Sequence, residues 1–364
     1  MNDVSDRPCI SVIIPFYNAG SHLERSVDLL LKQDFKRSFE IIMVDDASTD
    51  NGRSILEALN ISGLRLYSLP VNAGPAAARN LGLKNAKGEF VFFLDVDDRI
   101  AENALSSLYE IAIETDSDLV MCDKEWIENS RNQRENLFAY PSDRTFEQAE
   151  LMELMRRRFY EPTANGGIFD LTGRLFRRSI IVENNILFEE KLRYLEDETF
   201  AWDVLGEVRR ARYLRKQLYS YYVHPNVSSA LSEGIDKGFT VSYFKLIKRH
   251  IENSLMRRGF SKEEVKKHGD QALMFFVISA LVSYSKSMIL GKVDSKNGAA
   301  RRRKIIDEVI RDHEVSVAVK NYTCSKNESA WIPRAIAWRS RPLLEIACNR
   351  RAKEILRLRR KGLA

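Results

Sequence analysis

The chain has 364 residues, of which 44% are hydrophobic and 30% are charged, and this composition excludes a largely disordered or fibrous protein. Its length exceeds the ~250–300 residues at which single hydrophobic cores stop growing, so we expect one large domain and a further part. The formal net charge is +6, but residues 331–364 hold ten Lys and Arg against two Glu, a local balance of +8, and the rest sums to −2. The basic character therefore belongs to the tail.

The cysteines and apolar segments indicate a cytoplasmic protein. The longest apolar run, 273–282, is shorter than the ~20 residues that cross a bilayer, and we interpret it as a buried helix. The N-terminal residues are polar and lack the apolar stretch of a signal peptide. Reduced thiols are expected, because no C-x-x-C pair occurs among the widely spaced cysteines Cys9, Cys122, Cys324 and Cys348.

Short apolar runs alternate with helical patterns in the first third of the chain. Strands are expected at 10–14, 40–44, 64–69, 89–95 and 118–123, and helices at 23–33, 51–59, 74–86 and 101–115. This alternation predicts an α/β fold with a mostly parallel central sheet and flanking helices. Beyond about residue 235 the pattern is helical.

Acidic residues follow two of the predicted strands. Asp45 and Asp46 end one strand, and Asp95, Asp97 and Asp98 end another. Open parallel sheets bind ligands beyond the carboxyl ends of their strands. We therefore expect a ligand site at this edge.

The segment FLDVDD, residues 93–98, has the composition of a divalent-metal site. In an extended segment Asp95 and Asp97 project to the same side, and crowded carboxylates repel unless a proton or a cation lies between them. Mg²⁺ or Mn²⁺ removes this conflict, because such hard ions bind a few carboxylates and complete their shell with phosphate oxygens. A solvated acidic turn is the alternative, and the apolar strand before the acids favours the metal.

The segment VDDASTD, residues 44–50, predicts a tight turn into a helix. Ser48 or Asp50 can cap that helix. Capping does not explain both Asp45 and Asp46. A carboxylate at this position can accept the imide N–H of a uracil or thymine, or a ribose hydroxyl.

Four segments occur in a characteristic order: SVIIPFYN (11–18), VDDASTD (44–50), NAGPAAARNLG (72–82) and FLDVDD (93–98). Together they resemble the family 2 glycosyltransferases of the GT-A fold, which are inverting enzymes, many of them building bacterial polysaccharides. The resemblance covers roughly residues 9–230 and implies a GT-A domain at 1–230, with a nucleotide-binding half at about 9–123 and an acceptor half at about 124–230. The helical pattern beyond it predicts a helical C-terminal region at 231–364.

The resemblance also implies roles in nucleotide binding. Pro15 and Tyr17 match the motif that holds the nucleobase. Asp46 matches the acid that reads the uracil edge, with Asp45 beside it shaping the turn, and Arg79 matches a basic residue near the nucleotide.

The resemblance implies a metal site of Asp97, Asp95 and His224. Asp97 matches a direct ligand, and Asp95 a ligand of the metal or the ribose. Asp98 is a third acid often found there. His224 follows a tyrosine-rich segment and is implied to contact the metal or the diphosphate, and a turn residue before Pro225 is the alternative.

Inversion at a sugar carbon needs a base that takes the proton of the acceptor hydroxyl. In the segment LEDETF, residues 195–200, Asp197 matches the family's base and Glu196 is the alternative. An acidic first turn that favours the helix dipole explains the same residues without catalysis. Thr172 and Arg174 depart from the family's Trp-x-Lys pattern, and Trp202 is either a sugar-stacking or a core residue.

Residues 343–360 fit a basic amphipathic helix. Its apolar face consists of Leu344, Cys348, Ala352, Ile355 and Leu358, and the largely opposite basic face of Arg350, Lys353, Arg357 and Arg360. Such a helix can bind an anionic membrane surface, or it can dock on the protein with its charges in water. We expect peripheral attachment to the cytoplasmic face of the inner membrane, which suits a lipid-linked acceptor.

The sequence therefore predicts an inverting glycosyltransferase of cell-surface polysaccharide synthesis. It would move a sugar from a UDP-sugar to a saccharide or lipid-linked saccharide, with Mn²⁺ or Mg²⁺ as cofactor and no nucleic-acid partner. A nucleotidyltransferase and a catalytically silent nucleotide-binding assembly subunit stay open. A dehydrogenase and a P-loop NTPase are disfavoured, because G-x-G-x-x-G after the first strand and G-x-x-x-x-G-K-[ST] are absent.

Overall fold

The fold is described from a computed structural model of the whole chain, and it divides into two compact units. The sheet unit comprises Met1–Met155 and Asn165–Pro225, and the helical unit comprises Arg156–Ala164 and Asn226–Ala364. The structure describes residues 7–128, 131–133, 140–161, 166–192, 194–223, 234–235, 239–293, 295–325 and 328–360.

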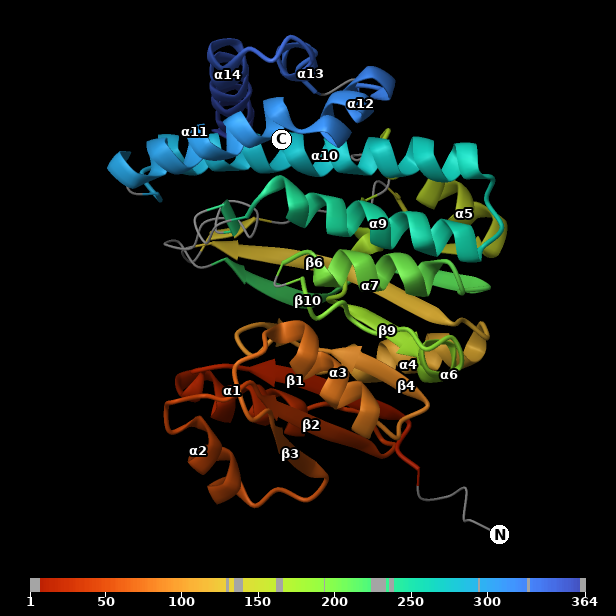
Figure 1. Ribbon diagram of the computed structural model, residues 1–364. Helices are drawn as coiled ribbons and strands as arrows, with labels where there is room; N and C mark the ends of the chain where they lie inside the picture. The colour runs from red at the N-terminus through yellow and green to blue at the C-terminus, as the bar shows by residue number, and fades with distance from the viewer. Residues whose placement is uncertain are drawn as a thin grey trace. The chain divides into compact units, whose positions relative to one another are not determined.

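The sheet unit contains one mixed sheet (Figure 1). Its strands are β1 (Ile10–Phe16), β2 (Phe39–Asp45), β3 (Leu64–Ser68), β4 (Phe90–Phe93), β5 (Arg99–Ile100), β6 (Leu119–Glu128), β7 (Arg131–Gln133), β8 (Arg144–Glu147), β9 (Arg174–Arg177) and β10 (Arg210–Val223). The order is β3-β2-β1-β4-β9-β6-β10-β5, while β7 pairs with β6 and β8 with β10. Strands β3, β2, β1 and β4 are parallel, as predicted, but β9 runs antiparallel to both β4 and β6.

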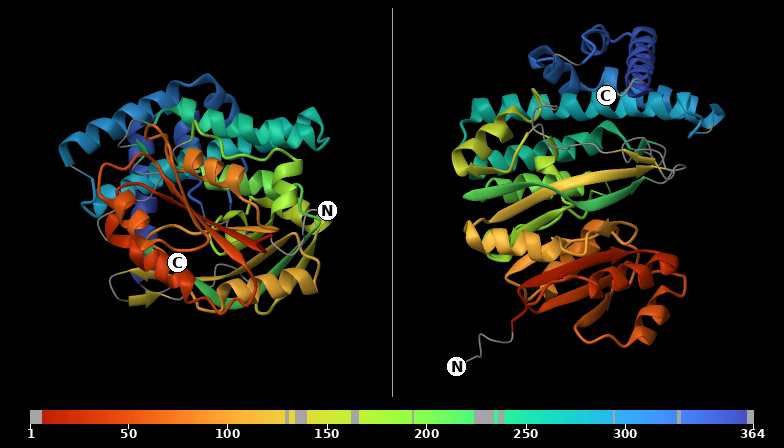
Figure 2. Two further views of the ribbon diagram at one scale, coloured as in Figure 1. Left: turned by 90° about the horizontal axis from the view of Figure 1, so that it is seen from below. Right: turned by 180° about the vertical axis from the view of Figure 1, so that it is seen from behind.

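Helices cover both faces of this sheet (Figure 2). They are α1 (Gly20–Leu31), α2 (Gly52–Leu59), α3 (Pro75–Asn85), α4 (Ala104–Glu114), α5 (Gln148–Arg157), α6 (Arg178–Glu183) and α7 (Glu196–Leu205). The side chains of β1 show which helices lie on which face, because successive side chains of a strand point to opposite faces of the sheet. Ile10, Val12 and Ile14 belong to the buried cluster that includes residues of α1, α2 and α4.

The opposite face of β1 receives α3 at close range. A Cβ on Gly82 of α3 would lie 2.5 Å from Cγ2 of Ile13, so only glycine allows this approach. The run Ala76–Ala78 before it is also buried. These small residues let α3 lie directly on the strand, which brings its side chains to the carboxyl edge of the sheet.

The helical unit is built around one long buried helix. Its helices are α9 (Val241–Arg257), α10 (Lys262–Ile289), α11 (Ser295–Arg311), α12 (His313–Asn321), α13 (Trp331–Ala337) and α14 (Arg341–Arg360). Helix α10 begins with a capping box between Ser261 and Glu264 and packs against α9, α11, α12 and α14. By length and composition α10 could cross a membrane, but 67% of its most apolar window is buried inside the fold. Residues 273–282 lie within it, as the predicted buried helix.

The packing of helix α14 shows that the apolar face predicted for the tail is not available to a membrane. Leu344, Cys348 and Ala352, from the face expected to enter a membrane, are at most 1% exposed. They are buried because α14 packs on α10, α11 and α13. The alternative, that this face docks on the protein, is the one the structure supports.

Candidate active site

The predicted site residues of the sheet unit gather at the carboxyl ends of β1, β2 and β4. Strand β1 pairs in parallel with both β2 and β4, so all three strands end at the same edge. The side chain of Tyr17, just past β1, is 49% exposed there. Pro15 lies within β1 opposite Val44 of β2.

The loops after β1 and β2 are joined by Asn18. Its Oδ1 accepts hydrogen bonds from the backbone N–H of Thr49 at 2.7 Å and of Asp50 at 3.3 Å, and its own N–H donates to Ser48 Oγ at 2.9 Å. Asn18 and Ala47 both have positive φ, 48° and 57°, a conformation that is uncommon for non-glycine residues, although asparagine adopts it more readily than most. This edge is therefore a preformed surface.

Asp45 and Asp46 are both buried and both hold backbone amides. Asp45 Oδ1 accepts from the N–H of Ser48 at 2.8 Å, which closes the turn after β2. The two oxygens of Asp46 accept from the N–H groups of Ala73 at 2.7 Å and Gly74 at 2.9 Å, which fixes the loop that leads into α3. This anchoring role of Asp46 was not predicted, and its contact with the nucleobase stays a prediction.

Arg79 connects the two acidic motifs of the site. Its Nη2 lies 3.0 Å from Asp95 Oδ1, and its Nη1 lies 2.8 Å from Glu196 Oε1 at the start of α7. Burial alone would lower the pKa of this guanidinium, but the charges of Asp95, Glu196 and Asp197 outweigh burial and raise its pKa. A permanent positive charge therefore joins the DxD segment to the Glu-Asp segment.

Asp98 is a buried acid held by β10. Tyr219 Oη donates to one carboxylate oxygen at 2.6 Å, and the backbone N–H of Tyr222 donates to the other at 2.9 Å. Burial first, and then the charges of Asp95 and Asp97, raise the pKa of Asp98 to about 8, although both hydrogen bonds oppose the change. The raised pKa reflects mainly the burial of this carboxyl, and to a lesser extent the neighbouring charges of Asp95 and Asp97.

The DxD loop is also fixed through its backbone. Arg25 of α1 donates to the carbonyl oxygen of Asp97 at 2.9 Å, and Ser26 Oγ donates to the carbonyl of Val96 at 2.5 Å. The side chains of Asp95 and Asp97 remain partly exposed. The backbone of this loop is therefore fixed by α1, while its carboxylates stay within reach of a ligand.

Asp197 stands in the first turn of α7. The residue before the helix, Leu195, has a φ of 64°, and the N–H of Glu198 donates to Asp197 Oδ1 at 2.8 Å. Burial first, and then the charges of Glu196 and Asp170, raise the pKa of Asp197 to about 8. A carboxylate with such a pKa is suited to accept a proton near neutral pH.

The residues that depart from the family pattern are structural. Arg174 is fully buried and donates to the carbonyl oxygens of Gly167 at 2.6 Å and Cys122 at 3.1 Å. Lys124 forms an ion pair with Asp170 and donates to Thr172 Oγ1 at 2.7 Å. Sequence reasoning missed this pair, since nothing in the local sequence joins residues 124 and 170.

Trp202, weighed as a sugar-stacking residue, is a core residue. Its side chain is 1% exposed and stacks on Phe169 with ring centroids 5.6 Å apart and an interplanar angle of 22°. A ring buried in this way leaves no face for a sugar.

Comparison with known proteins matches the sheet unit to one family. The model of "Glycosyl transferase family 2" matches residues 11–183. The poly(ribitol-phosphate) beta-N-acetylglucosaminyltransferase TarP of Staphylococcus aureus is 31% identical over 265 residues, which cover 71% of this chain and 76% of TarP. The chain belongs to glycosyltransferase family 2. It is therefore an enzyme, a glycosyltransferase, as the sequence predicted.

Similarity to this family extends into the helical unit. The uncharacterized glycosyltransferase YibD of Escherichia coli is 27% identical over 345 residues, 91% of this chain and 94% of YibD. The crystal structure of S. aureus TarS 1–349 in complex with UDP-GlcNAc superposes with a TM-score of 0.63 at 23% identity, covering 97% of this chain and 92% of that one. The predicted fold class, a GT-A domain with a C-terminal helical extension, is confirmed.

The donor set of this family 2 site suits a hard divalent cation. Asp95 and Asp97 offer partly exposed carboxylate oxygens, which are the ligands that Mg²⁺ and Mn²⁺ prefer, and their charges contribute to the raised pKa of Asp98. Among the described residues no group of three or more His, Cys, Asp or Glu is arranged to hold a metal by itself, so phosphate oxygens of a donor would have to complete the shell. His224, the third predicted ligand, lies outside the described residues.

Proposed function

We propose that this enzyme transfers a sugar from a UDP-sugar to a saccharide or lipid-linked saccharide acceptor of cell-surface polysaccharide synthesis, with inversion at the sugar carbon. The observation that carries the proposal is the bridge by Arg79 from Asp95 to Glu196. It links the acids suited to the donor phosphates with the acids suited to the acceptor in one buried ion network. The names of two relatives support the donor class, since TarP and TarS are N-acetylglucosaminyltransferases and TarS was crystallised with UDP and UDP-GlcNAc.

In this proposal the nucleotide binds at the edge formed by β1 and β2. The exposed ring of Tyr17 stacks on the base, and the backbone around Pro15 shapes the floor. Asp46 reads the base edge in addition to holding the N–H groups of Ala73 and Gly74, and Asp45 keeps the turn closed through Ser48. The hydrogen bonds that Asn18 makes between the two loops hold them in place before the nucleotide arrives.

Asp97 and Asp95 would hold the divalent metal together with the diphosphate. When bound, Mg²⁺ or Mn²⁺ supplies positive charge to the leaving diphosphate. Arg79 orients Asp95 through the 3.0 Å ion pair, and Asp98 anchors the loop to β10. These residues thus position the donor phosphates.

Asp197 is the proposed base. It takes the proton of the attacking acceptor hydroxyl while the new glycosidic C–O bond forms and the bond to the UDP oxygen breaks. Glu196, the alternative, is engaged by Arg79 at 2.8 Å, whereas the pKa of Asp197 is raised to about 8 and its carboxylate is matched to proton transfer near neutral pH. The ion pair of Glu196 therefore supports Asp197 for the role.

Release of UDP from a panel of nucleotide sugars, with Mn²⁺, with Mg²⁺ and with EDTA, tests the proposal. We expect one or a few UDP-sugars to be turned over, only with metal, and faster with a lipid-linked glycan extract as acceptor. Binding of UDP without turnover of any donor would favour a silent assembly subunit. Release of pyrophosphate from a nucleoside triphosphate and a sugar phosphate would instead identify a nucleotidyltransferase.

A further inference from the structure

The helical unit carries an exposed surface that its own packing does not use. Four large apolar side chains of α13, α14 and the residue between them are exposed, namely Trp331 (51%), Trp338 (61%), Leu343 (40%) and Ile346 (64%). Cationic side chains stand exposed among them, namely Arg334, Arg339, Arg350 and Lys353. We call these eight residues the aromatic-basic patch.

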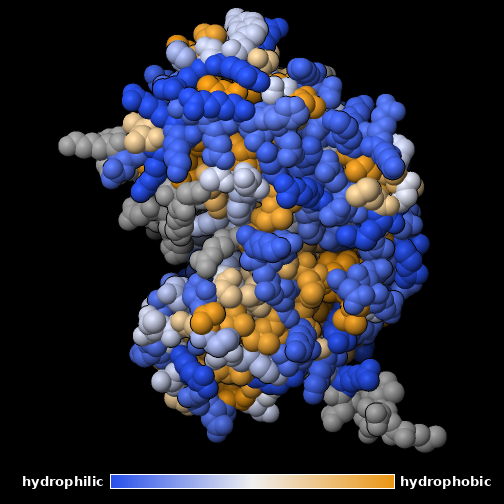
Figure 3. All heavy atoms as spheres, in the orientation of Figure 1, coloured by the Kyte–Doolittle hydropathy of each residue, from blue (hydrophilic) through white to orange (hydrophobic). Residues whose placement is uncertain are grey.

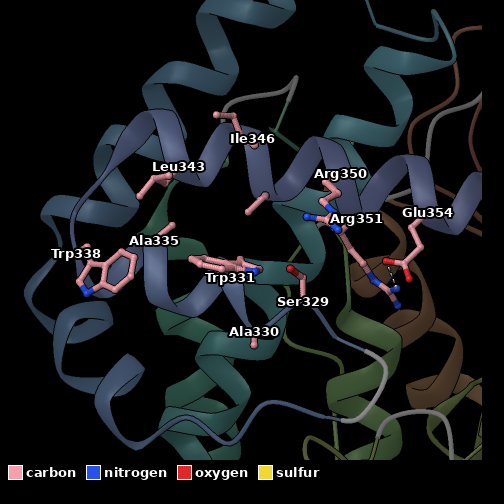
Figure 4. Close-up of a pocket in the computed structure, with 11 residues that line it drawn as sticks. Ser329, Ala330, Trp331, Ala335, Trp338, Leu343, Ile346, Arg350, Arg351 and Glu354 are labelled. Carbon is pink, nitrogen blue, oxygen red and sulfur yellow. Dashed lines mark hydrogen bonds and ion pairs between the residues drawn. The ribbon is translucent and has the colours of Figure 1, made fainter.

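The patch surrounds a groove between α13 and α14 (Figure 4). The groove has a volume of about 310 Å³ and is lined by Trp331, Trp338, Leu343 and Ile346, with Arg350 at one end. The indole rings of Trp331 and Trp338 lie 6.5 Å apart. Hydrophobic atoms appear among hydrophilic ones at the end of the unit that carries these two helices (Figure 3).

The fold does not need these side chains for its core. Helix α13 packs through Ile332 and Ile336, and α14 packs through Leu344 and Cys348, all of them buried. Exposed contiguous apolar surface in a folded protein typically marks an interaction site. Of the chain's four tryptophans, Trp202 is core, whereas the two in the patch are more than half exposed.

The positive charge around the patch indicates what kind of partner binds there. Residues 331–364 carry a balance of +8, and the patch itself holds four cations. One acid, Glu354, also lines the groove, but it forms an ion pair with Arg351 at 2.9 Å, so the local balance stays positive. A second copy of the chain that joined the first patch to patch would bring like charges together, which is unfavourable. An anionic surface is attracted instead, at ~1 kcal/mol for each Lys or Arg near a lipid surface.

The side-chain types fit a bilayer in particular. Indole rings favour the membrane–water interface, where the ring is buried at headgroup level and the N–H stays hydrated. Arg334 lies over the ring of Trp331, 5.5 Å from its centroid, so a cation and an aromatic ring are presented together. Helix α14 presents this surface from the side opposite to its buried face.

We propose that the aromatic-basic patch docks the protein on an anionic lipid bilayer. The four apolar side chains enter the headgroup region, and the four cations contact lipid phosphates. The surface differs from the one expected from the tail sequence, whose apolar residues Leu344, Cys348 and Ala352 are covered. The proposal does not rest on the reaction proposed above.

Sedimentation of the full chain with vesicles tests the proposal. Vesicles of phosphatidylcholine alone are compared with vesicles that also contain phosphatidylglycerol, at low and high salt. We expect binding to the anionic vesicles, weakening with salt, and a blue shift of tryptophan fluorescence as the indoles leave water. Equal binding to both vesicle types, or no binding to either, would overturn the proposal.

Two double variants locate the surface. Arg334→Gln with Arg350→Gln should weaken vesicle affinity about fivefold for each charge removed, and Trp331→Ala with Trp338→Ala should abolish the fluorescence shift. All four side chains are exposed, so thermal unfolding should stay unchanged. Ile289→Ala with Leu290→Ala, exposed elsewhere on the same unit, is the matched control.

The proposal also fails if both patch variants bind anionic vesicles as the wild type does. Light scattering tests whether a second copy of the chain, and not a lipid surface, covers the patch. Suppose that the wild-type protein does not bind vesicles but forms an oligomer, and that this oligomer dissociates in the tryptophan variant. The patch would then be a contact between copies of the chain, which would contradict the lipid assignment.

Discussion

At the scale of single residues, Arg79 is the feature on which the site depends most. It is buried, it contacts acids from two motifs 101 residues apart in the sequence, and its guanidinium lies 5.6 Å from the ring centroid of Phe188. Breaking a buried ion pair by removing one partner leaves the other charge uncompensated. Arg79 therefore acts on both stability and chemistry.

Replacing Arg79 by Met should lower the free energy of unfolding by about 3–5 kcal/mol, because Asp95 and Glu196 would lose their shared cation. The paired variant Arg79→Met/Glu196→Gln should recover part of this loss, since it removes one of the stranded charges. Urea unfolding followed by circular dichroism measures both. Equal stability of wild type and Arg79→Met would contradict the buried ion network.

Sequence motifs allow prediction of those side chains whose place in the fold follows from their position next to a strand or a helix. Asp95, Asp97 and Asp197 were predicted because each belongs to a short segment at the end of a strand or start of a helix. Partners that meet only through tertiary packing leave no such signal. The bond from Tyr219 to Asp98 and the ion pair of Lys124 with Asp170 belong to this second kind.

At the scale of elements, the segment NAGPAAARNLG shows how a helix brings Arg79 to the edge of the sheet. Gly74 has a φ of 95°, which glycine adopts without strain, and Pro75 begins the helix where its missing N–H is not needed. Gly82 then permits contact with Ile13. The motif that identified the family is, in physical terms, a close-packing device.

Gly82→Ala tests this device. Alanine favours an isolated helix by about 1 kcal/mol over glycine, but its Cβ would lie 2.5 Å from Ile13, and overpacking costs about 1–3 kcal/mol. We expect net destabilisation, seen as a lower urea midpoint with an unchanged m-value. Lys84→Ala, at an exposed position of the same helix, should be neutral. Stabilisation by Gly82→Ala would show that α3 does not approach β1 so closely.

Strands β1, β2, β4 and the first part of β6 were predictable because each contains a run of apolar residues. Strand β9 was not, since RLFR is short and places two arginines in four residues. It becomes a strand through tertiary context, because it inserts antiparallel between β4 and β6 and the Nη atoms of Arg174 donate to backbone carbonyls. Helix α14 illustrates the same limit, because an amphipathic pattern predicts the apolar face of a helix but not what covers it.

At the scale of the whole molecule, the two units have separate tasks in our account. The described residues that we place in the transfer reaction belong to the sheet unit, and the aromatic-basic patch belongs to the helical unit. Sequence periodicity predicted a helical C-terminal region and its basic charge. The proposed lipid-facing surface emerged only from the exposed fractions of Trp331, Trp338, Leu343 and Ile346, which the helical pattern of the tail had assigned to no face.

The central claim is that Asp197 accepts the proton of the acceptor in a metal-dependent sugar transfer. The pH profile of kcat/KM tests it most directly, with wild type, Asp197→Asn and the neighbouring control Glu198→Gln compared. The base must be deprotonated, so wild-type kcat/KM should rise with pH and level off above about 8. Asp197→Asn should lose about 10²–10⁴-fold and the rising limb, while Glu198→Gln keeps both and all three bind UDP with metal equally. Retention of the limb and most of the activity by Asp197→Asn would contradict the account.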